Sequence, residues 1–313
     1  MDYKNLRIIF MGTPEFAVAS LNKLVEAGCN IVAVVTAPDK PGGRGMQLQG
    51  SAVKNYAIEK NLAVLQPEKL KNPEFLETLC SFKADLQIVV AFRMLPEIVW
   101  NMPPMGTLNL HGSLLPQYRG AAPINWAIIN GEKETGVTSF MLKHEIDTGD
   151  ILLSEKILIA DDETAGTLHD KMKEKGASVL LETIIRLAEG KIKETPQENF
   201  VNQPGLILKH APKIFTETCN IDWSKSCEAI NNLIRGLSPY PAAFTKLDEK
   251  KLKIFTATIE KTTPTCSVGL HETDNKTYLR FACNDGYIYI TDLQLEGKKR
   301  MKAEDFLRGY RFN

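Results

Sequence analysis

The chain has 313 residues, which is enough for about two domains, each with its own hydrophobic core. Its 38 basic and 38 acidic residues balance, so the overall charge singles out neither nucleic acid nor a membrane surface as a partner. The balance is uneven along the chain, because residues 209–313 carry 17 Lys and Arg against 13 Asp and Glu. This small excess fits either a surface that faces a polyanion or ordinary scatter.

Six cysteines are spread along the chain without the short paired spacing of a metal site, so we expect buried or incidental thiols and no metal. The first residues lead directly into an apolar strand, and we expect no secretory leader. None of the apolar runs reaches the roughly 18 residues of a membrane span. We therefore expect a cytoplasmic, monomeric protein with no membrane partner.

Short apolar runs alternate with helical patterns through the first half of the chain. The apolar runs predict strands, and the patterns between them predict helices at 16–27, 53–60 and 73–82; the strands are 6–11, 31–36, 62–65, 86–92, 107–110 and 137–142. This alternation predicts a Rossmann-like α/β fold, a doubly wound and mostly parallel sheet with helices on both faces. A helix over 164–189 would close this domain.

The second half of the chain changes character. The proline-containing polar stretch at 191–212 predicts an extended linker, and a single amphipathic helix is predicted at 224–237. Alternating runs rich in Thr, Ile and Tyr then predict strands at 244–247, 252–259, 278–283 and 287–295, with a hairpin turn at 284–286. A small, OB-like β-barrel is the simplest fold for these strands. We expect domains over 1–190 and 209–313, joined by a linker over 191–208.

The first predicted strand ends in the sequence MGTPEF. A dinucleotide-binding turn would need three spaced glycines here, and only Gly12 is present, so we expect no nucleotide cofactor at this turn. Loops at this edge of an α/β sheet are nevertheless a common place for a substrate. Gly12, Thr13 and Phe16 are therefore candidates for substrate contact, with an ordinary strand-to-helix turn as the alternative.

The second predicted loop, at 36–49, contains two prolines and three glycines and presents Lys40 and Arg44. Loops of this length without secondary structure are usually functional or disordered, and we expect this one to be mobile. An Arg flanked by glycines can reach a nucleic acid backbone or base edge. Lys40 and Arg44 are therefore candidates for contact with a polyanionic substrate.

Three polar residues able to do chemistry follow in a strand, loop, helix, strand segment: Asn109, His111 and Asp147. Residues two apart on a strand project to the same face, so Asn109 and His111 would point together, and Asp147 arrives from a glycine-rich turn one supersecondary unit later. Each residue alone would more often form a turn or a structural hydrogen bond. Together, an amide donor, an imidazole and a carboxylate suit acyl transfer, which needs oxyanion stabilisation and proton removal.

These segments carry a resemblance over essentially the whole chain. The chain resembles the bacterial methionyl-tRNA formyltransferases in the stretches FMGTPEFAV, PDKPGGRG, LNLHGSLLPQYRGAAPINWAI, ETGV, DTGDIL, KIFTETCNIDW and RGLSPYPAAF. The central block is shared by all folate-dependent formyltransferases of this fold, whereas the PDKPGGRG loop and the C-terminal stretches are more selective for the tRNA enzymes. The resemblance implies a formyltransferase domain followed by a tRNA-binding β-barrel.

The resemblance also implies roles for individual residues. Asn109, His111 and Asp147 match the catalytic residues of the family, and the donor, 10-formyltetrahydrofolate, would bind in a cleft. The residues expected to line that cleft are Val90, Phe92, Arg93, Leu95, Ser113, Leu114, Leu115, Pro116 and His144. Arg93 stands where many tRNA formyltransferases have glycine. The acceptor would be initiator methionyl-tRNA, giving N-formylmethionyl-tRNA for translation initiation.

Two alternatives remain open at this point. A formyltransferase acting on a ribonucleotide or on a nucleotide sugar would share the catalytic trio, but it would not need the basic, glycine-flanked loop or a basic C-terminal domain. A noncatalytic protein that binds folate or tRNA would have no use for the trio. Arg119 is compatible with a solvated charge, and Trp126 with packing of a helix.

Overall fold

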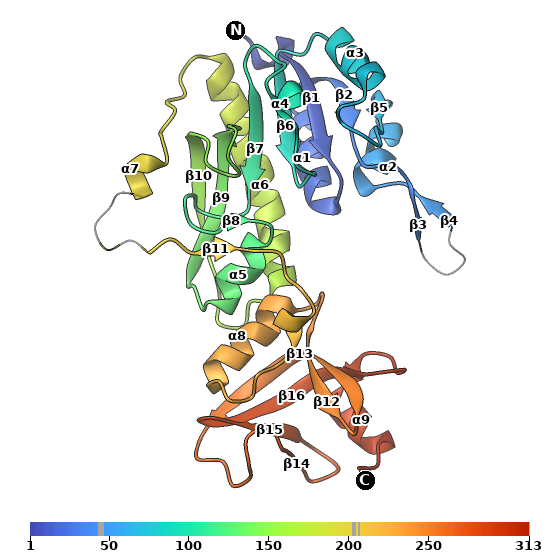
Figure 1. Cartoon of the computed structure of the whole chain (residues 1–313), viewed down its shortest axis with the longest axis vertical. Coiled ribbons are helices and arrows are strands. Elements are labelled where there is room, and N and C mark those ends of the chain that lie inside the picture. Colours follow the sequence, from blue (N-terminus) through green and yellow to red (C-terminus); the bar gives the residue numbers. More distant parts are fainter. Residues whose placement is uncertain (43–46, 202–204, 206, 313) are drawn as a thin grey trace. The chain divides into compact units, whose positions relative to one another are not determined.

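The computed structural model describes the chain except for residues 43–46, 202–204, 206 and 313 (Figure 1). It divides into two compact units, which are described separately. The first unit comprises Met1–Arg119, Gly136–Ile157 and His169–Lys209, and the second comprises Gly120–Thr135, Leu158–Leu168 and His210–Asn313. No helix within the described part of the chain combines the length and apolarity needed to cross a membrane.

The first unit is built on a seven-stranded sheet with the order β10-β9-β7-β6-β1-β2-β5. The strands are β1 (Arg7–Gly12), β2 (Asn30–Val35), β5 (Val64–Leu65), β6 (Leu86–Val90), β7 (Thr107–His111), β9 (Glu134–Met141) and β10 (Ile151–Leu158). Pairing is parallel from β5 to β7 and antiparallel between β7 and β9. The chain runs from β1 outwards to β2 and β5, then crosses to the other side of β1 for β6 and β7. The strand order therefore reverses between β1 and β6, which is where ligands bind in folds of this kind.

Helices cover both faces of this sheet. On one face, α3 (Pro73–Ser81) and α4 (Glu97–Trp100) pack against a cluster that includes Ile9, Met11 and Val89. On the other face, α6 (Ala165–Ala188) comes so close to β7 and β9 that a Cβ on Gly176 would lie 2.8 Å from Leu110. The remaining helices of the unit are α1 (Glu15–Glu26), α2 (Ala52–Glu59), α7 (Glu198–Val201) and the short 3-10 helix η1 (Tyr3–Asn5). The predicted doubly wound, mostly parallel α/β fold is confirmed.

Some elements of the first unit differ from the sequence prediction. The structure adds strand β10 and helices α4 and α7, and it pairs β3 (Lys40–Gly42) with β4 (Gln47–Gln49) in a projecting hairpin (Figure 1). β10 escaped prediction because its buried and exposed residues follow no strict alternation, as expected at a sheet edge with mixed contacts. α4 and α7 have only four residues each, too few for a helical period to emerge.

The second unit contains a curled antiparallel sheet with the order β12-β13-β16-β15-β14, in which β17 also pairs with β16. Its strands are β12 (Ala243–Leu247), β13 (Lys250–Lys261), β14 (His271–Thr273), β15 (Leu279–Cys283), β16 (Gly286–Leu295) and β17 (Met301–Lys302). The other elements are α5 (Pro123–Ile129), α8 (Cys227–Leu237), α9 (Ala303–Gly309), η2 (Glu217–Cys219), β11 (His210–Ala211) and β8 (Arg119–Gly120), whose first residue belongs to the first unit. The predicted small C-terminal β fold is thus confirmed as a curled half-barrel.

The core of the second unit lies between α8 and this sheet. α8 begins after Ser226, whose hydroxyl accepts a hydrogen bond from the backbone N–H of Ala229, and it buries Ile230 and Ile234 against the strands. Trp223 stacks on Phe281, with ring centroids 4.6 Å apart. Ser226 fixes the start of the helix at Cys227, three residues later than the sequence predicted, because its side chain caps the first turn.

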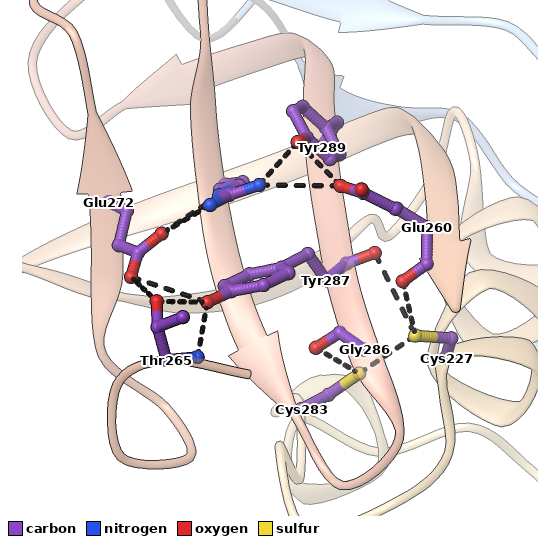
Figure 2. A network of polar contacts seen from close by, with 9 residues as sticks. Cys227, Glu260, Thr265, Glu272, Cys283, Gly286, Tyr287 and Tyr289 are labelled. Atoms are coloured by element: carbon purple, nitrogen blue, oxygen red, sulfur yellow. Dashed lines mark hydrogen bonds and ion pairs between the residues drawn. The ribbon is translucent and has the colours of Figure 1, made fainter. Parts of the chain in front are cut away.

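Polar residues crosslink the strands of the second unit (Figure 2). The Arg280 guanidinium lies 3.8 Å from the centroid of the Tyr287 ring and donates to Glu272, at 2.6 Å between Nη2 and Oε2. Tyr289 donates from its hydroxyl to Glu260 at 2.6 Å. These contacts join β13, β14, β15 and β16 through their side chains, in addition to their backbone ladders.

Two buried thiols lie beside this network (Figure 2). The Sγ atoms of Cys227 and Cys283 are 3.0 Å apart, and burial raises the pKa of the Cys227 thiol. With Asp285 they bring three possible metal ligands within 4.8 Å of one another, but Asp285 already accepts a hydrogen bond from the backbone N–H of Cys227 at 2.6 Å. The expectation of buried thiols is confirmed here, whereas Cys80 is exposed and Cys266 is partly exposed.

Candidate active site

His111 is the last residue of β7, and its imidazole is held between two groups. Nε2 lies 2.9 Å from the backbone oxygen of Tyr118, and Nδ1 lies 3.8 Å from Oδ2 of Asp147. A carbonyl oxygen only accepts, so Nε2 must carry a proton and donate it. The other ring nitrogen, Nδ1, faces the carboxylate. The imidazole is 8% exposed, which limits competition from water.

Asp147 lies on the turn between β9 and β10 and adopts a left-handed backbone conformation, with φ of +55°. Its side chain is only 11% exposed. The turn is tight, because a Cβ on Gly149 would lie 1.5 Å from the backbone oxygen of Met141. Only glycine fits there. Unusual backbone conformations of this kind often occur at functional sites, where the surrounding structure must hold them.

Asn109 is two residues before His111 on β7, and the two side chains share one face of the sheet. The backbone of Asn109 pairs with Val89 on β6 and with Phe140 on β9. Its partly exposed amide makes no hydrogen bond to any described residue. The amide is therefore free to donate to a ligand. The structure thus places Asn109 and His111 on one face of β7, and Asp147 beside His111.

The segment that follows His111 is tied to the sheet. The Thr138 hydroxyl donates to the backbone oxygen of Ser113 at 2.7 Å and accepts from the backbone N–H of Leu115 at 3.2 Å. Gly136 allows Leu114 to pack on β9, because a Cβ there would lie 2.4 Å from Leu114. Ser113, Leu115 and Pro116 are buried, so these residues shape the loop more than they expose contact groups.

Residues Gly12 and Val90 lie where the strand order reverses. Gly12 ends β1 beside Val90, the last residue of β6, and a Cβ on Gly12 would lie 2.6 Å from the Cβ of Ala17. Phe16 is buried, with its ring 5.2 Å from that of His169, whereas Thr13 is partly exposed. The structure gives Gly12 and Phe16 packing roles, and substrate contact at Gly12, Thr13 and Phe16 stays a prediction.

The segment after β6 carries three of the residues predicted to bind the donor. Phe92 and Leu95 are partly buried and join the cluster under α3 and α4. The Arg93 guanidinium donates to the backbone oxygens of Glu68, at 2.8 Å, and Pro67, and its desolvation lowers the pKa of this side chain. His144 is exposed on the β9–β10 connection. Their predicted contact with a donor remains to be tested.

Of the two basic residues predicted in the second loop, Lys40 is exposed at the start of β3, paired with Gln49. Arg44 lies outside the described residues. Asp39 next to the hairpin accepts from Gln66 and from Lys54, both of which lower the pKa of its carboxyl group. Asp39, at the base of the loop, is therefore anchored, and substrate contact at Lys40 and Arg44 stays a prediction.

Three residues of the site were not recognised in the sequence. Tyr118 supplies the oxygen that fixes His111, with its own N–H donating to Lys209 at 2.7 Å. Gln197, predicted to lie in a linker, is fully buried and donates to the backbone oxygen of Asp147 at 2.9 Å. Arg119, compatible with a solvated charge, donates to Gln197. Gln197 and Lys209 lie far along the chain from these partners, so local sequence carried no signal for them.

The second unit contains a hollow with a cavity volume of about 430 Å³. Its lining includes Phe215 and Tyr240, which are 57% and 82% exposed, and the amines of Lys251 and Lys253. Exposed aromatic rings beside amines are the groups that bind bases and phosphates of unpaired nucleotides. The hollow is therefore a second candidate site, with chemistry different from that around His111.

Comparisons with known proteins match both units of the chain to formyl transferases. Residues 5–184 match the family described as formyl transferase, and residues 213–311 match the formyl transferase C-terminal domain. The methionyl-tRNA formyltransferase of Bacteroides fragilis is 52% identical over 99% of this chain and 97% of its own, and that of Phocaeicola vulgatus is 55% identical over 99% and 98%. HypX from Aquifex aeolicus, solved with tetrahydrofolic acid, has a similar fold (TM-score 0.65, 20% identity) over 98% of this chain and 48% of that one. The chain belongs to the formyl transferase family.

Proposed function

We propose that this protein transfers the formyl group of 10-formyltetrahydrofolate to the α-amino group of methionyl initiator tRNA. The observation that carries the proposal is the similarity to methionyl-tRNA formyltransferases, which runs through both units at 52–55% identity. A match confined to the first unit would have left the acceptor open, because formyl transfer to any amine needs the same catalytic groups. Here the second unit, with its exposed aromatic rings and amines, matches as well.

The geometry of the first unit supports the chemistry. In the proposed reaction, the neutral α-amine attacks the formyl carbon, and the carbonyl oxygen becomes an oxyanion. The Asn109 amide would donate to that oxygen, as would Nδ1–H of the protonated His111, because Nε2–H is held by Tyr118 and Nδ1 lies 3.8 Å from Asp147, too far for a hydrogen bond. The buried carboxylate of Asp147 would stabilise the imidazolium through its charge. The bond from the formyl carbon to the folate nitrogen then breaks. The amine proton passes to that nitrogen, directly or through water, with Asp147 helping the transfer.

The donor would bind along the edge where β6 and β7 end. The loops after these strands lie beside the reversal of strand order, where α/β folds bind ligands. HypX holds tetrahydrofolic acid in a related fold. We infer a similar position for the donor here, near Val90 to Leu95 and Leu114. A melting-temperature titration with 5-formyltetrahydrofolate tests this inference, since a ligand that binds the folded state raises the melting temperature.

The acceptor would engage the second unit. Lys251 and Lys253 would meet phosphates, and the rings of Phe215 and Tyr240 would stack on unpaired bases. Arg44 and Lys40 would approach the acceptor end of the tRNA. Arg44→Ala should therefore reduce formylation of charged initiator tRNA far more than it changes folate binding. We propose a cytoplasmic location for the enzyme, because its charged tRNA substrate is used in translation there. We also propose that it is a monomer.

The decisive experiment is a formyl transfer assay with purified protein and 10-formyltetrahydrofolate. Charged initiator tRNA, a ribonucleotide amine and a nucleotide-linked amino sugar are compared as acceptors at two salt concentrations. We expect transfer to tRNA alone, with tRNA affinity falling steeply as salt rises, because phosphate contacts release counterions. Preference for a sugar or ribonucleotide amine would leave only the formyltransferase class, and no transfer to any amine would favour a noncatalytic binding protein.

A further inference from the structure

Gln197 is fully buried just before α7, and every polar group of its amide has a partner. Its Nε2 donates to the backbone oxygens of Asp147, at 2.9 Å, and Gly149, at 2.8 Å. Its Oε1 accepts from Nε and Nη2 of Arg119, at 3.0 and 2.6 Å. A primary amide has two N–H groups and one oxygen with two lone pairs. All four positions are thus used in this one place.

The two carbonyl groups that Gln197 binds belong to the turn that carries the Asp147 carboxylate. That turn holds Asp147 in a left-handed conformation and Gly149 against β9, an arrangement that persists only when neighbouring groups support it. The 3.8 Å between the carboxylate and Nδ1 of His111 depends on the position of this turn. Gln197 holds both carbonyls through one rigid amide plane, so it fixes the turn at two points.

Arg119 decides which way the amide of Gln197 points. A guanidinium only donates hydrogen bonds, so the amide oxygen must face Arg119 and the amide NH₂ must face the turn. Rotation of the amide by half a turn would oppose donors to donors on one side and acceptors to acceptors on the other. Arg119 therefore orients Gln197 in the direction that supports Asp147.

We propose that Gln197 is a positioning residue for formyl transfer, which holds the carboxylate of Asp147 at His111, and that Arg119 orients it. Gln197 is not a catalytic residue, since its amide bonds the backbone of the turn and the Arg119 guanidinium. The inference rests on the proposed function, in which Asp147 stabilises the imidazolium of His111. It also gives the segment around Gln197, which the sequence predicts to be only a linker, a role in positioning the catalytic group.

The substitution Gln197→Glu tests this role. A carboxylate has nearly the same shape as the amide and still pairs with Arg119, but it cannot donate to the carbonyls of Asp147 and Gly149. We expect single-turnover formylation to slow by about 10²-fold, the cost of misplacing a catalytic group by roughly 1 Å. The KM values for donor and tRNA should change little. The matched control is Glu198→Gln at the exposed neighbouring residue, which should keep wild-type rates.

The contrary results are equally specific. Wild-type turnover by Gln197→Glu, or a rise in both KM values in step with a lower melting temperature, would replace positioning with a general structural role. If Gln197→Glu does not fold, Arg119→Met carries the test, because it frees the amide to rotate and should lower kcat at unchanged KM; full activity would overturn the proposal.

Measuring Gln197→Glu in the Asp147→Asn variant distinguishes failure of this inference from failure of the proposed function. If Gln197 acts through Asp147, adding Gln197→Glu to Asp147→Asn should cost little further activity, since residues that act as a unit are not additive. An additive loss would overturn positioning through Asp147. A fully active Asp147→Asn would instead remove the proposed mechanism itself, whatever Gln197→Glu does.

Discussion

Both units contain residues with a left-handed backbone conformation, and two pairs of them lie in contrasting surroundings. In the first unit, Tyr118 and Asp147 have positive φ, are buried and hold or face the imidazole of His111. In the second unit, Glu249 and Asn275 have positive φ at exposed hairpin turns between neighbouring strands. For these residues, the same backbone conformation is part of a candidate site in one case and of a simple chain reversal in the other.

The difference follows from what packs on each turn. The turn of Asp147 joins two antiparallel strands, β9 and β10, so strand direction does not distinguish it from the hairpin turns of the second unit. The segment around Gln197 packs on this turn and holds its backbone oxygens. The turns at Glu249 and Asn275 are exposed. We therefore expect substitutions at the first unit's loops to affect catalysis, and substitutions on the second unit's surface to affect affinity.

Among the substitutions that test this difference between the units, Asp147→Asn should have the largest effect on turnover. Removal of the negative charge deprives the imidazolium of His111 of its partner and removes a group that helps proton transfer. We expect turnover to fall by about 10²–10⁴-fold with tRNA affinity unchanged. Single-turnover kinetics and a filter-binding assay measure the two quantities. Loss of tRNA binding without loss of chemistry would reverse the assignment of tasks to the two units.

Asn109→Ala comes next in expected size. The substitution removes the donor that we propose for the developing oxyanion, and the loss of such a donor costs about 2.7–4 kcal/mol in the chemical step. The amide makes no bond to other described residues, so melting temperature should stay near that of the wild type. Single-turnover rates and thermal unfolding are the measurements. A variant with normal turnover would show that the oxyanion is stabilised without Asn109.

The double substitution Lys251→Ala and Lys253→Ala tests whether the second unit sets the affinity for tRNA. If each amine contacts a phosphate, the plot of log K for tRNA binding against log salt concentration should become less steep. We expect its slope to change by about 0.7–0.9 for each lysine removed. The chemical step at saturating tRNA should not change. Lys276→Ala, an exposed lysine outside the lining of the hollow, is the matched control. Unchanged affinity and slope would place the acceptor elsewhere on the protein.

The smallest predicted effect concerns stability at high pH in the second unit. Burial, together with a hydrogen bond to Asp248, raises the pKa of Tyr310 to about 12. The folded state therefore favours the neutral phenol, and this contribution is full below the ordinary pKa of about 10 and is lost as pH rises towards 12. Urea unfolding between pH 8 and 11 should show a shallower decline for Tyr310→Phe than for the wild type. Parallel curves would exclude this contribution.

The sequence alone determined the elements whose patterns are local. The buried runs of β1, β2 and β6 and the spacing of Asn109 and His111 on β7 were predictable, since residues two apart on a strand share a face. Short motifs around Gly12, His111 and Gly149 carried the resemblance to formyltransferases. The alternating strands after α8 predicted a small β fold for the same local reason.

Only the tertiary structure decided how distant segments meet. Gln197 lies in a polar, proline-containing stretch with no periodic signal, and its burial depends on a turn 50 residues earlier in the chain. The orientation of His111 depends on the carbonyl of Tyr118, whose N–H is held by Lys209. Hydrogen bonds between such segments arise only after the sheet brings its connections together. The candidate catalytic residues could therefore be named from the sequence, whereas the groups that hold them could not.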